Sequence, residues 1–141
     1  MKKTFTTSQE AEDAFYGALA RADLDAMMEV WAEDEEVVCV HPGGPRLAGY
    51  EPVRTSWKGM FTSGQKLRVK ITEALIRAGT MYAIHSVHEH ISAIGDAGEP
   101  AVVISTNVYV RTSGGWRMIE HHGSIAPTAP RPASEVPKIL H

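Results

Sequence analysis

Histidine is the residue type that gives this 141-residue sequence its clearest potential for chemistry, with seven copies along the chain. An imidazole changes charge near neutral pH, so it can transfer a proton in catalysis or bind a metal ion. His41 directly follows the apolar run 37–40 and precedes Pro42, where a short strand would end. A neutral His41 could act as a general base near pH 7. The alternative is a ring that only hydrogen-bonds the backbone of the turn.

Polar residues at a spacing of two occur in the second half of the chain. In a strand, alternate side chains share one face, so parity decides which of them could meet a ligand. If Tyr82 and Ile84 face the interior of the protein, then Ser86, His88 and His90 do so as well. We therefore predict ligand contacts for Ser86 and His88.

The same rule applies to two later segments. If Asn107 faces the interior, Ser105 and Tyr109 share its face. In the last strand either His121 or His122 must face inward, but not both, and a β-bulge would reverse the choice. Both histidines are therefore candidates for ligand binding.

A metal site is a second use for histidines at this spacing. His88 and His90 would place two imidazoles on one strand face, and Glu120 or His121 could add a third ligand. Glu89 would point to the opposite face from His88, so polar lining is the favoured interpretation and we predict no metal site. The sequence has no phosphate-binding loop and no dinucleotide fingerprint, so we expect no cofactor.

Two tryptophans and the single cysteine complete the set of candidate residues. Trp57 and Trp31 could stack on a flat ligand, although aromatic residues at helical spacing more often pack in a core. We expect Trp31 in the core and keep Trp57 as a candidate for ligand binding. Cys39 lies in an apolar run without a nearby charge, which predicts a buried, unreactive thiol.

Three helices and a short strand are predicted to position the first of these residues. Apolar residues recur at helical spacing from Ser8, a predicted N-cap, and again after Asp23. A third helical pattern lies between Gly49 and Gly64. The apolar run 37–40 predicts a short, buried strand between the second and third helices.

Long strands are predicted to hold the remaining candidates. Four runs with period-two alternation are separated by glycine-containing turns: 66–77, 80–94, 101–112 and 116–125. Such runs predict an antiparallel meander. Following three helices and one short strand, it indicates an α+β fold in which a strongly curved sheet wraps around the helices.

Length and composition limit the classes of protein that the chain can belong to. At 141 residues it should form one domain, and we expect that domain over 1–126 with a proline-rich tail over 127–141. A formal charge of -3 with scattered Lys and Arg argues against nucleic acid as a partner. No segment approaches the roughly 20 apolar residues that a bilayer span needs, so we expect no membrane partner and a cytoplasmic location.

The order of these elements resembles the NTF2-like superfamily over about residues 5–126. Three segments carry the resemblance: Ala22-Asp23-Leu24-Asp25 through Trp31-Ala32-Glu33-Asp34, His41-Pro42-Gly43-Gly44 with Gly49, Val53 and Trp57, and Thr106-Asn107-Val108-Tyr109-Val110-Arg111 followed by 115–124. They are similar to the helix hairpin, the third helix and the final hairpin of SnoaL-like members, and the last is also similar to the association domain of calcium/calmodulin-dependent protein kinase II. The resemblance implies a cone-shaped fold around a small pocket.

The resemblance also implies roles for individual residues. His41 occupies the position of the general base in similar ketosteroid isomerases, and Asn107 lies near that of an acid which donates to the substrate. Phe15 stands near the place of a tyrosine that donates to the substrate oxyanion, and a phenyl ring cannot donate a hydrogen bond. The family favours His121 over His122 as the inward histidine, and it implies pairing into homodimers through the convex face of the sheet.

Two functions from different classes follow as expectations. The first is binding of a small, largely apolar organic ligand, with Trp57, Ser86, His88, His121 and His122 as ligand contacts. Any catalysis would be a cofactor-independent isomerisation or dehydration, with His41 as base and Asn107 or Tyr109 as donor. The alternative is a non-catalytic association module that forms oligomers and keeps the pocket as a vestige or regulatory site. The sequence does not decide whether the protein is an enzyme.

Overall fold

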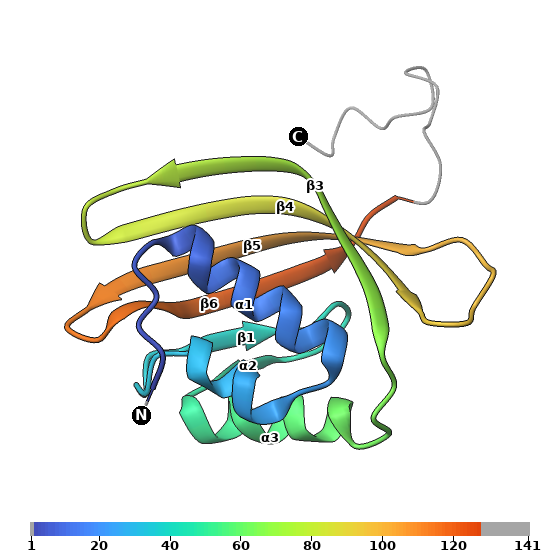
Figure 1. The fold of residues 1–141 in the computed structure, drawn as a ribbon, viewed down its shortest axis with the longest axis horizontal. Helices are drawn as coiled ribbons and strands as arrows, with labels where there is room; N and C mark the ends of the chain where they lie inside the picture. The colour runs from blue at the N-terminus through green and yellow to red at the C-terminus, as the bar shows by residue number, and fades with distance from the viewer. Residues whose placement is uncertain (1, 128–141) are drawn as a thin grey trace.

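Three helices form the first half of the molecule, and a computed structural model describes residues 2–127 (Figure 1). The helices are α1 (Ser8–Arg21), α2 (Leu24–Val30) and α3 (Tyr50–Phe61). Thr7 rather than Ser8 is the N-cap of α1, because its side chain accepts a hydrogen bond from the amide of Glu10. Asp23 caps α2 as predicted. None of these helices is long and apolar enough to cross a bilayer.

Six strands form one mixed sheet in the spatial order β2-β1-β6-β5-β4-β3. Their bounds are β1 (Val38–Val40), β2 (Arg46–Ala48), β3 (Leu67–Ala78), β4 (Tyr82–Ala93), β5 (Ala101–Thr112) and β6 (Gly115–Ile125). Strands β3 to β6 are the predicted antiparallel meander, whereas β1 lies parallel to β6. The α+β class is therefore confirmed. Sequence analysis missed β2, since three residues show too little alternation to predict a strand.

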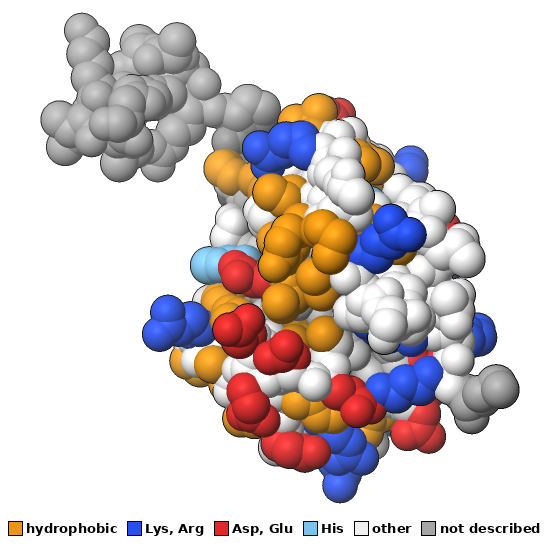
Figure 2. All heavy atoms as spheres, turned by 90° about the vertical axis from the view of Figure 1, so that its left-hand side faces the viewer, with side chains coloured by type: hydrophobic (Ala, Val, Ile, Leu, Met, Phe, Trp, Pro, Cys, Tyr) orange, Lys and Arg blue, Asp and Glu red, His pale blue; other side chains and the backbone are white. Residues whose placement is uncertain are grey.

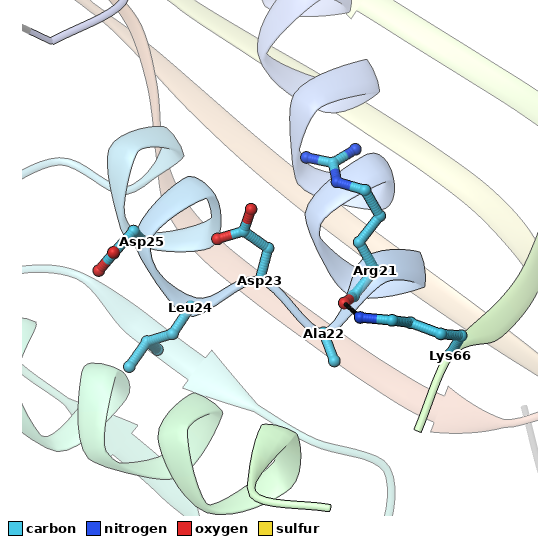
Figure 3. Close-up of a pocket in the computed structure, with 6 residues that line it drawn as sticks. All are labelled: Arg21, Ala22, Asp23, Leu24, Asp25 and Lys66. Carbon is cyan, nitrogen blue, oxygen red and sulfur yellow. Dashed lines mark hydrogen bonds between the residues drawn. The ribbon is translucent and has the colours of Figure 1, made fainter. Parts of the chain in front are cut away.

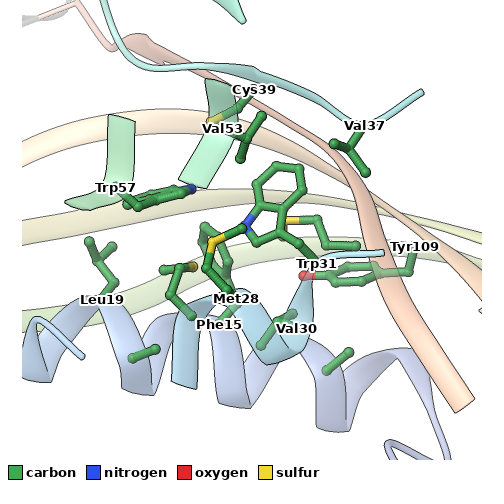
Figure 4. Packing of buried hydrophobic residues seen from close by; sticks show 14 of the residues in the cluster. Phe15, Leu19, Met28, Val30, Trp31, Val37, Cys39, Val53, Trp57 and Tyr109 are labelled. Carbon is green, nitrogen blue, oxygen red and sulfur yellow. The ribbon is translucent and has the colours of Figure 1, made fainter. Parts of the chain in front are cut away.

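The concave face of the curved sheet encloses the helices and the core (Figures 1 and 4). Helix α1 contacts β3, β5 and β6, while α2 and α3 lie near the short strands. The largest side chains that are fully buried there are those of Trp31, Trp57, Tyr109, Phe15, Met27 and Met118. Trp31 is thus a core residue, as predicted. The predicted tail over 127–141 lies outside the described residues except for Pro127.

An irregular pairing in β6 decides which side chains face the core. Val108 pairs with Glu120, but the next residue of β5, Tyr109, pairs with Met118, so Ile119 is an extra residue in β6. This bulge switches the parity of the strand. Met118 and His121 are both buried even though three positions separate them.

Candidate functional site

Polar side chains are buried between α1 and the concave face of the sheet. In this interior polar cluster, α1 contributes Ser8, Glu12 and Tyr16, β4 contributes His85 and Glu89, β5 contributes Ser105, Asn107 and Tyr109, and β6 contributes His121. The helical members are spaced by four residues and so share one face of α1. Burial of a polar group without a partner is unfavourable by several kcal/mol, roughly 2 to 7, so such a cluster needs internal hydrogen bonds.

Glu12 is the centre of the cluster. Its Oε1 accepts hydrogen bonds from Asn107 Nδ2 at 3.0 Å and from the Tyr109 hydroxyl at 2.8 Å, and its Oε2 lies 3.1 Å from His85 Nδ1. Burial alone would raise the pKa of Glu12. The contacts with His85, Asn107 and Tyr109 outweigh burial, and the pKa lies below its usual value. Glu12 is therefore an ionised carboxylate that can only accept hydrogen bonds.

This carboxylate determines how Asn107 and His121 are oriented. Because Glu12 accepts only, the amide nitrogen of Asn107 faces Glu12 and its Oδ1 faces His121, 2.6 Å from Nδ1. The proton of the His121 ring therefore sits on Nδ1, and Nε2 carries a lone pair. Burial, together with the nearby His41 and His122, lowers the pKa of His121 to about 3, so the ring is neutral at pH 7.

Tyr16 connects Asn107 to a second buried carboxyl group. The Tyr16 hydroxyl accepts from Asn107 Nδ2 at 2.9 Å and donates to Glu89 Oε2. Burial raises the pKa of Glu89, although the hydrogen bond from Tyr16 acts in the opposite direction. Burial and the Glu89 charge also raise the pKa of Tyr16, so its hydroxyl stays protonated. Both amide hydrogens of Asn107 are thus engaged within the protein.

His41 is held by α3 rather than by the turn that follows β1. Its Nε2 lies 3.0 Å from Ser56 Oγ, and that hydroxyl donates its single hydrogen to the carbonyl of Val53 at 2.8 Å. Ser56 must therefore accept from His41, which places the proton on Nε2 and leaves a lone pair on Nδ1. Burial lowers the pKa of His41 and favours the neutral ring. Cys39 is buried and its pKa is raised to about 12, in agreement with an unreactive thiol.

Trp57 lies close to both neutral imidazoles. Its ring centre is 4.7 Å from that of His41 in an edge-to-face arrangement and 6.2 Å from that of His121. Phe15 and Phe61 pack against the same indole at 5.7 and 5.6 Å. Trp57 is almost fully buried, and its Nε1 has no hydrogen-bond partner in the described structure. The result is a buried, apolar, aromatic surface next to two proton acceptors.

Five predicted residues meet in this region: His41, Trp57, Asn107, Tyr109 and His121. Asn107 and Tyr109 share the inward face of β5, as the parity rule predicted. His121 faces inward and His122 is exposed, because the bulge at Ile119 sets this register.

The parity expected for β4 is wrong. Ala83, His85, Val87 and Glu89 form its buried face, so Ser86 and His88 lie on the opposite face of the sheet with Tyr82, which is 57% exposed. The expectation had assumed that the aromatic Tyr82 faces inward. His88 and His90 are therefore outside the interior, and residues 2–127 contain no group of three side chains suited to a metal ion.

Five members of the cluster were missed in the sequence: Ser8, which was assigned only as a helix cap, Glu12, Tyr16, His85 and Glu89. Glu12 and Tyr16 lie among the apolar positions of the first helix, and this interruption of the apolar stripe was the available signal. His85 and Glu89 have the opposite parity to the residues that we selected in β4. Tyr16 and the adjacent Phe15 are both buried, with ring centres 4.9 Å apart, so Tyr16 belongs to the interior of the cone.

One hollow on the described surface lies away from the cluster. It measures about 540 Å³ and lies where α1 meets α2 (Figure 3). Arg21, Ala22, Asp23, Leu24, Asp25 and Lys66 line it, and Lys66 Nζ donates to the carbonyl of Arg21 at 2.6 Å. Because none of these residues belongs to the interior cluster, the candidate site is the cluster itself, with the aromatic surface at Trp57.

Comparison with known proteins defines the family. The SnoaL-like domain model matches residues 9–128, so the chain belongs to the SnoaL-like domain family. A solved structure from Thiobacillus denitrificans ATCC 25259, provisionally described as a calcium/calmodulin-dependent protein kinase type II association domain, is similar with 39% identity and a TM-score of 0.77, over 89% of this chain and all of that one. The resemblance to NTF2-like proteins is therefore confirmed.

Two further relatives are informative. A structure from Streptomyces avermitilis, provisionally described as a dehydratase of the NTF2-like family, has 27% identity and a TM-score of 0.79, over 86% of this chain and 95% of that one. The F-box protein SKIP8 of Arabidopsis thaliana is 27% identical over 111 residues, which is 79% of this chain and 46% of that protein. This chain thus spans about half the length of the curated relative that it matches.

Proposed function

We propose that the protein binds a small, largely apolar organic molecule inside the cone and carries out cofactor-independent acid–base chemistry on it, an isomerisation or a dehydration. The observation that carries this proposal is the pair of neutral imidazoles close to Trp57. The ring N–H of His41 donates to Ser56, and the ring N–H of His121 donates to Asn107. Each therefore keeps one lone pair for a ligand.

The two imidazoles suit different tasks. The pKa of His41 is lowered by burial alone, and a histidine base works best when its pKa lies near the working pH. His41 Nδ1 is thus the better proton acceptor. His121, with a pKa of about 3, stays neutral and is suited to accept a hydrogen bond from a ligand hydroxyl. A dehydration removes a hydroxyl group and a proton from the adjacent carbon, so two such groups suit this reaction. The Streptomyces avermitilis neighbour is provisionally described as a dehydratase.

Asn107 and Tyr109 act as positioning residues in this proposal. The hydrogens of the Asn107 amide and the Tyr109 hydroxyl are already donated within the cluster, so neither is free for a substrate carbonyl. Asn107 fixes the His121 tautomer, and Tyr109 helps to keep Glu12 ionised. The side chain of Trp57 provides the apolar wall against which a ligand would pack.

The experiment is a thermal-shift screen against small hydroxy-carbonyl compounds and aromatic acids, because a ligand of the native state raises the apparent melting temperature. Wild type is compared with His41→Ala and His121→Gln. His122→Ala is the matched control, since His122 neighbours His121 but is exposed. We expect stabilisation in wild type and in the control that both interior variants lose. Equal stabilisation of all four proteins, or none by any compound, would contradict the proposal.

The second candidate is an association module that forms homodimers through the convex face of the sheet. On β5 the outward side chains of Val102, Ile104, Val108 and Val110 are half-buried and apolar, and Ile84 pairs with Val108 on the same face. Apolar side chains on the outer face of a sheet are typical of interfaces between identical subunits. The similarity to the association domain from Thiobacillus denitrificans supports this function.

Solution mass tests the second candidate. Ile104→Glu places a charge on the apolar face, while Thr55→Glu adds the same charge on the exposed side of α3. We expect light scattering to give a dimer or larger ring for wild type and Thr55→Glu, and a monomer for Ile104→Glu. A monomeric wild type at about 100 μM would exclude the association function.

A further inference from the structure

At the start of α1, three buried side chains are arranged in the order of a hydrolase triad. Ser8 Oγ lies 2.9 Å from His85 Nε2, and His85 Nδ1 lies 3.1 Å from Glu12 Oε2. A hydroxyl, an imidazole and a buried carboxylate in this order activate a serine nucleophile on several unrelated folds. We propose that Ser8, His85 and Glu12 form a nucleophilic site that accepts an acyl group from small apolar esters.

The charges and hydrogens in the structure agree with this arrangement. Glu12 is ionised and can only accept, so the proton of the His85 ring lies on Nδ1, toward Glu12. His85 Nε2 then carries the lone pair, and Ser8 donates its hydroxyl hydrogen to it. The Nδ1 contact does not have the geometry of a regular hydrogen bond, and triad geometry of this kind often tightens only when substrate binds. Tyr109 packs against the His85 ring at 4.9 Å and fixes its orientation.

Backbone amides next to Ser8 can stabilise the negative charge that acyl transfer creates. Ser8 is the first residue of α1, and the amides of Glu10 and Ala11 are both bonded to Thr7. The amides of Ser8 and Gln9 belong to the first turn, where no intrahelical acceptor exists. The amide that follows a nucleophilic serine is a common oxyanion donor, and the helix dipole adds positive potential there.

A partly exposed apolar side chain lies beside this triad within the described residues. Ile76 pairs directly with His85 across β3 and β4 and is 46% exposed. Met81, in the turn before β4, is 53% exposed, whereas the exposed Leu75 and Tyr82 belong to the opposite face of the sheet. The view onto this end of the molecule shows hydrophobic side chains gathered on the surface (Figure 2). An exposed apolar side chain next to His85 favours an ester with an aliphatic or aromatic acyl group.

The proposed ester hydrolysis needs only the triad and water. Ser8 Oγ attacks the ester carbonyl while His85 Nε2 takes the hydroxyl proton. The C–O bond to the leaving group then breaks, and His85 returns the proton to that oxygen, which releases an alcohol. Water, deprotonated by His85, hydrolyses the acyl-serine to a carboxylic acid and restores the Ser8 hydroxyl. Glu12 is shared with the cluster described above, but neither His41 nor His121 takes part, and neither Ser8 nor His85 is used in the function proposed above.

The first test measures p-nitrophenyl acetate hydrolysis and labelling by a fluorophosphonate probe, with the label located by peptide mass mapping. We expect one label per chain, on Ser8. Ser8→Ala should abolish labelling, and His85→Gln should lower ester turnover at least about 100-fold. Ser92→Ala, a half-buried serine elsewhere on β4, is the control and should behave as wild type. Absence of label on Ser8, or full turnover in Ser8→Ala, would overturn the proposal.

A second variant keeps the test valid if Ser8→Ala or His85→Gln folds poorly. Ser8→Cys places a thiol at the same position in a chain whose natural cysteine, Cys39, is buried. A thiol activated by an imidazole and a helix N-terminus alkylates faster than an ordinary one. We expect iodoacetamide at pH 7 to modify the introduced thiol at least about ten times faster than free cysteine. A rate equal to that of free cysteine would overturn the proposal.

Discussion

Asn107 Oδ1 lies 2.6 Å from His121 Nδ1. Because Asn107 also donates to Glu12, the charge of Glu12 determines the tautomer of His121. Glu12 and Asn107 are 95 positions apart in the chain, yet their hydrogen bond fixes which nitrogen of His121 has a lone pair. Catalytic and binding histidines in general depend on such a partner for their tautomer.

The Asn107 side chain should contribute strongly to the free energy of unfolding, because it hydrogen-bonds three buried groups. Asn107→Leu leaves Glu12, Tyr16 and His121 without a shared partner in a buried site, and each unpaired polar group costs about 1–3 kcal/mol. We expect a loss of about 3 kcal/mol or more in the free energy of unfolding, measured by urea titration. Thr106→Ala, the exposed neighbour, should change it by about 0.5 kcal/mol or less. Equal effects of the two substitutions would mean that the network is not coupled to folding.

Stability should fall in weak acid because of His121. Its folded pKa of about 3 is depressed below the ordinary value near 6.5, so the unfolded state binds more protons between these two values. The contribution of His121 is therefore fully present above about pH 6.5 and is lost as pH falls toward 3. We expect the free energy of unfolding to drop by up to about 1.4 kcal/mol per pH unit in this window.

Urea titrations at pH 7, 6 and 5 measure this slope. His121→Gln removes the titrating group while a side-chain amide can still donate to Asn107, so its slope should be smaller. The lowered pKa of His41 contributes in the same direction and stays in both proteins. Identical slopes for wild type and the variant would show that His121 is not buried as a neutral ring.

The hydrogen bond from Tyr16 should stabilise the ionised form of Glu89. Burial raises the folded pKa of Glu89, so its ionisation opposes folding as pH rises above the unfolded value, and the Tyr16 hydroxyl limits this effect. Tyr16→Phe should destabilise the protein by about 1–3 kcal/mol at pH 7, and by less at pH 5 where Glu89 can bind a proton. Tyr50→Phe is the control, because the Tyr50 hydroxyl makes only a long contact of 3.5 Å to Met28 O. A loss that does not depend on pH would argue against ionisation of Glu89.

Two adjacent glycines in the β5–β6 turn should respond differently to alanine. Gly115 has φ +106°, and a Cβ there would meet Phe5 O at 2.7 Å, whereas a Cβ on Gly114 would meet nothing closer than 3.8 Å. Gly115→Ala should cost about 1–3 kcal/mol through backbone strain and this clash. Gly114→Ala should be close to neutral. Thermal unfolding of the two variants gives the comparison, and equal melting temperatures would contradict the turn geometry.

Much of the fold could be predicted because its signals are local. The helix after Asp23 follows from a side-chain cap, and the four long strands follow from alternation that extends over many residues. Local hydrogen bonds and side-chain period act within a few positions of the chain, so they can be recognised without knowledge of the partners. The order of these elements was also sufficient to predict the family, to which the family model assigns the chain.

The site was predicted only in part because it depends on register. His41, Trp57, Asn107, Tyr109 and His121 meet as expected, since β5 keeps a regular alternation. Ser86 and His88 were misplaced because an aromatic residue near a strand end, Tyr82, faces outward in the structure. A shift of one position moves every side chain of a strand to the other face, so one such assumption misplaces the whole set.

The sequence alone determined the elements, their order and the residue types that could do chemistry. Tertiary structure decided the register of β4 and β6 and the contacts that the buried polar residues make. The extra residue Ile119 turns His121 toward the core, and the packing of α1 brings Glu12 to Asn107 and Ser8 to His85. These contacts join positions that are 14 to 95 residues apart in the chain, so no local pattern encodes them. They form because buried polar groups must find partners once the apolar surfaces have closed.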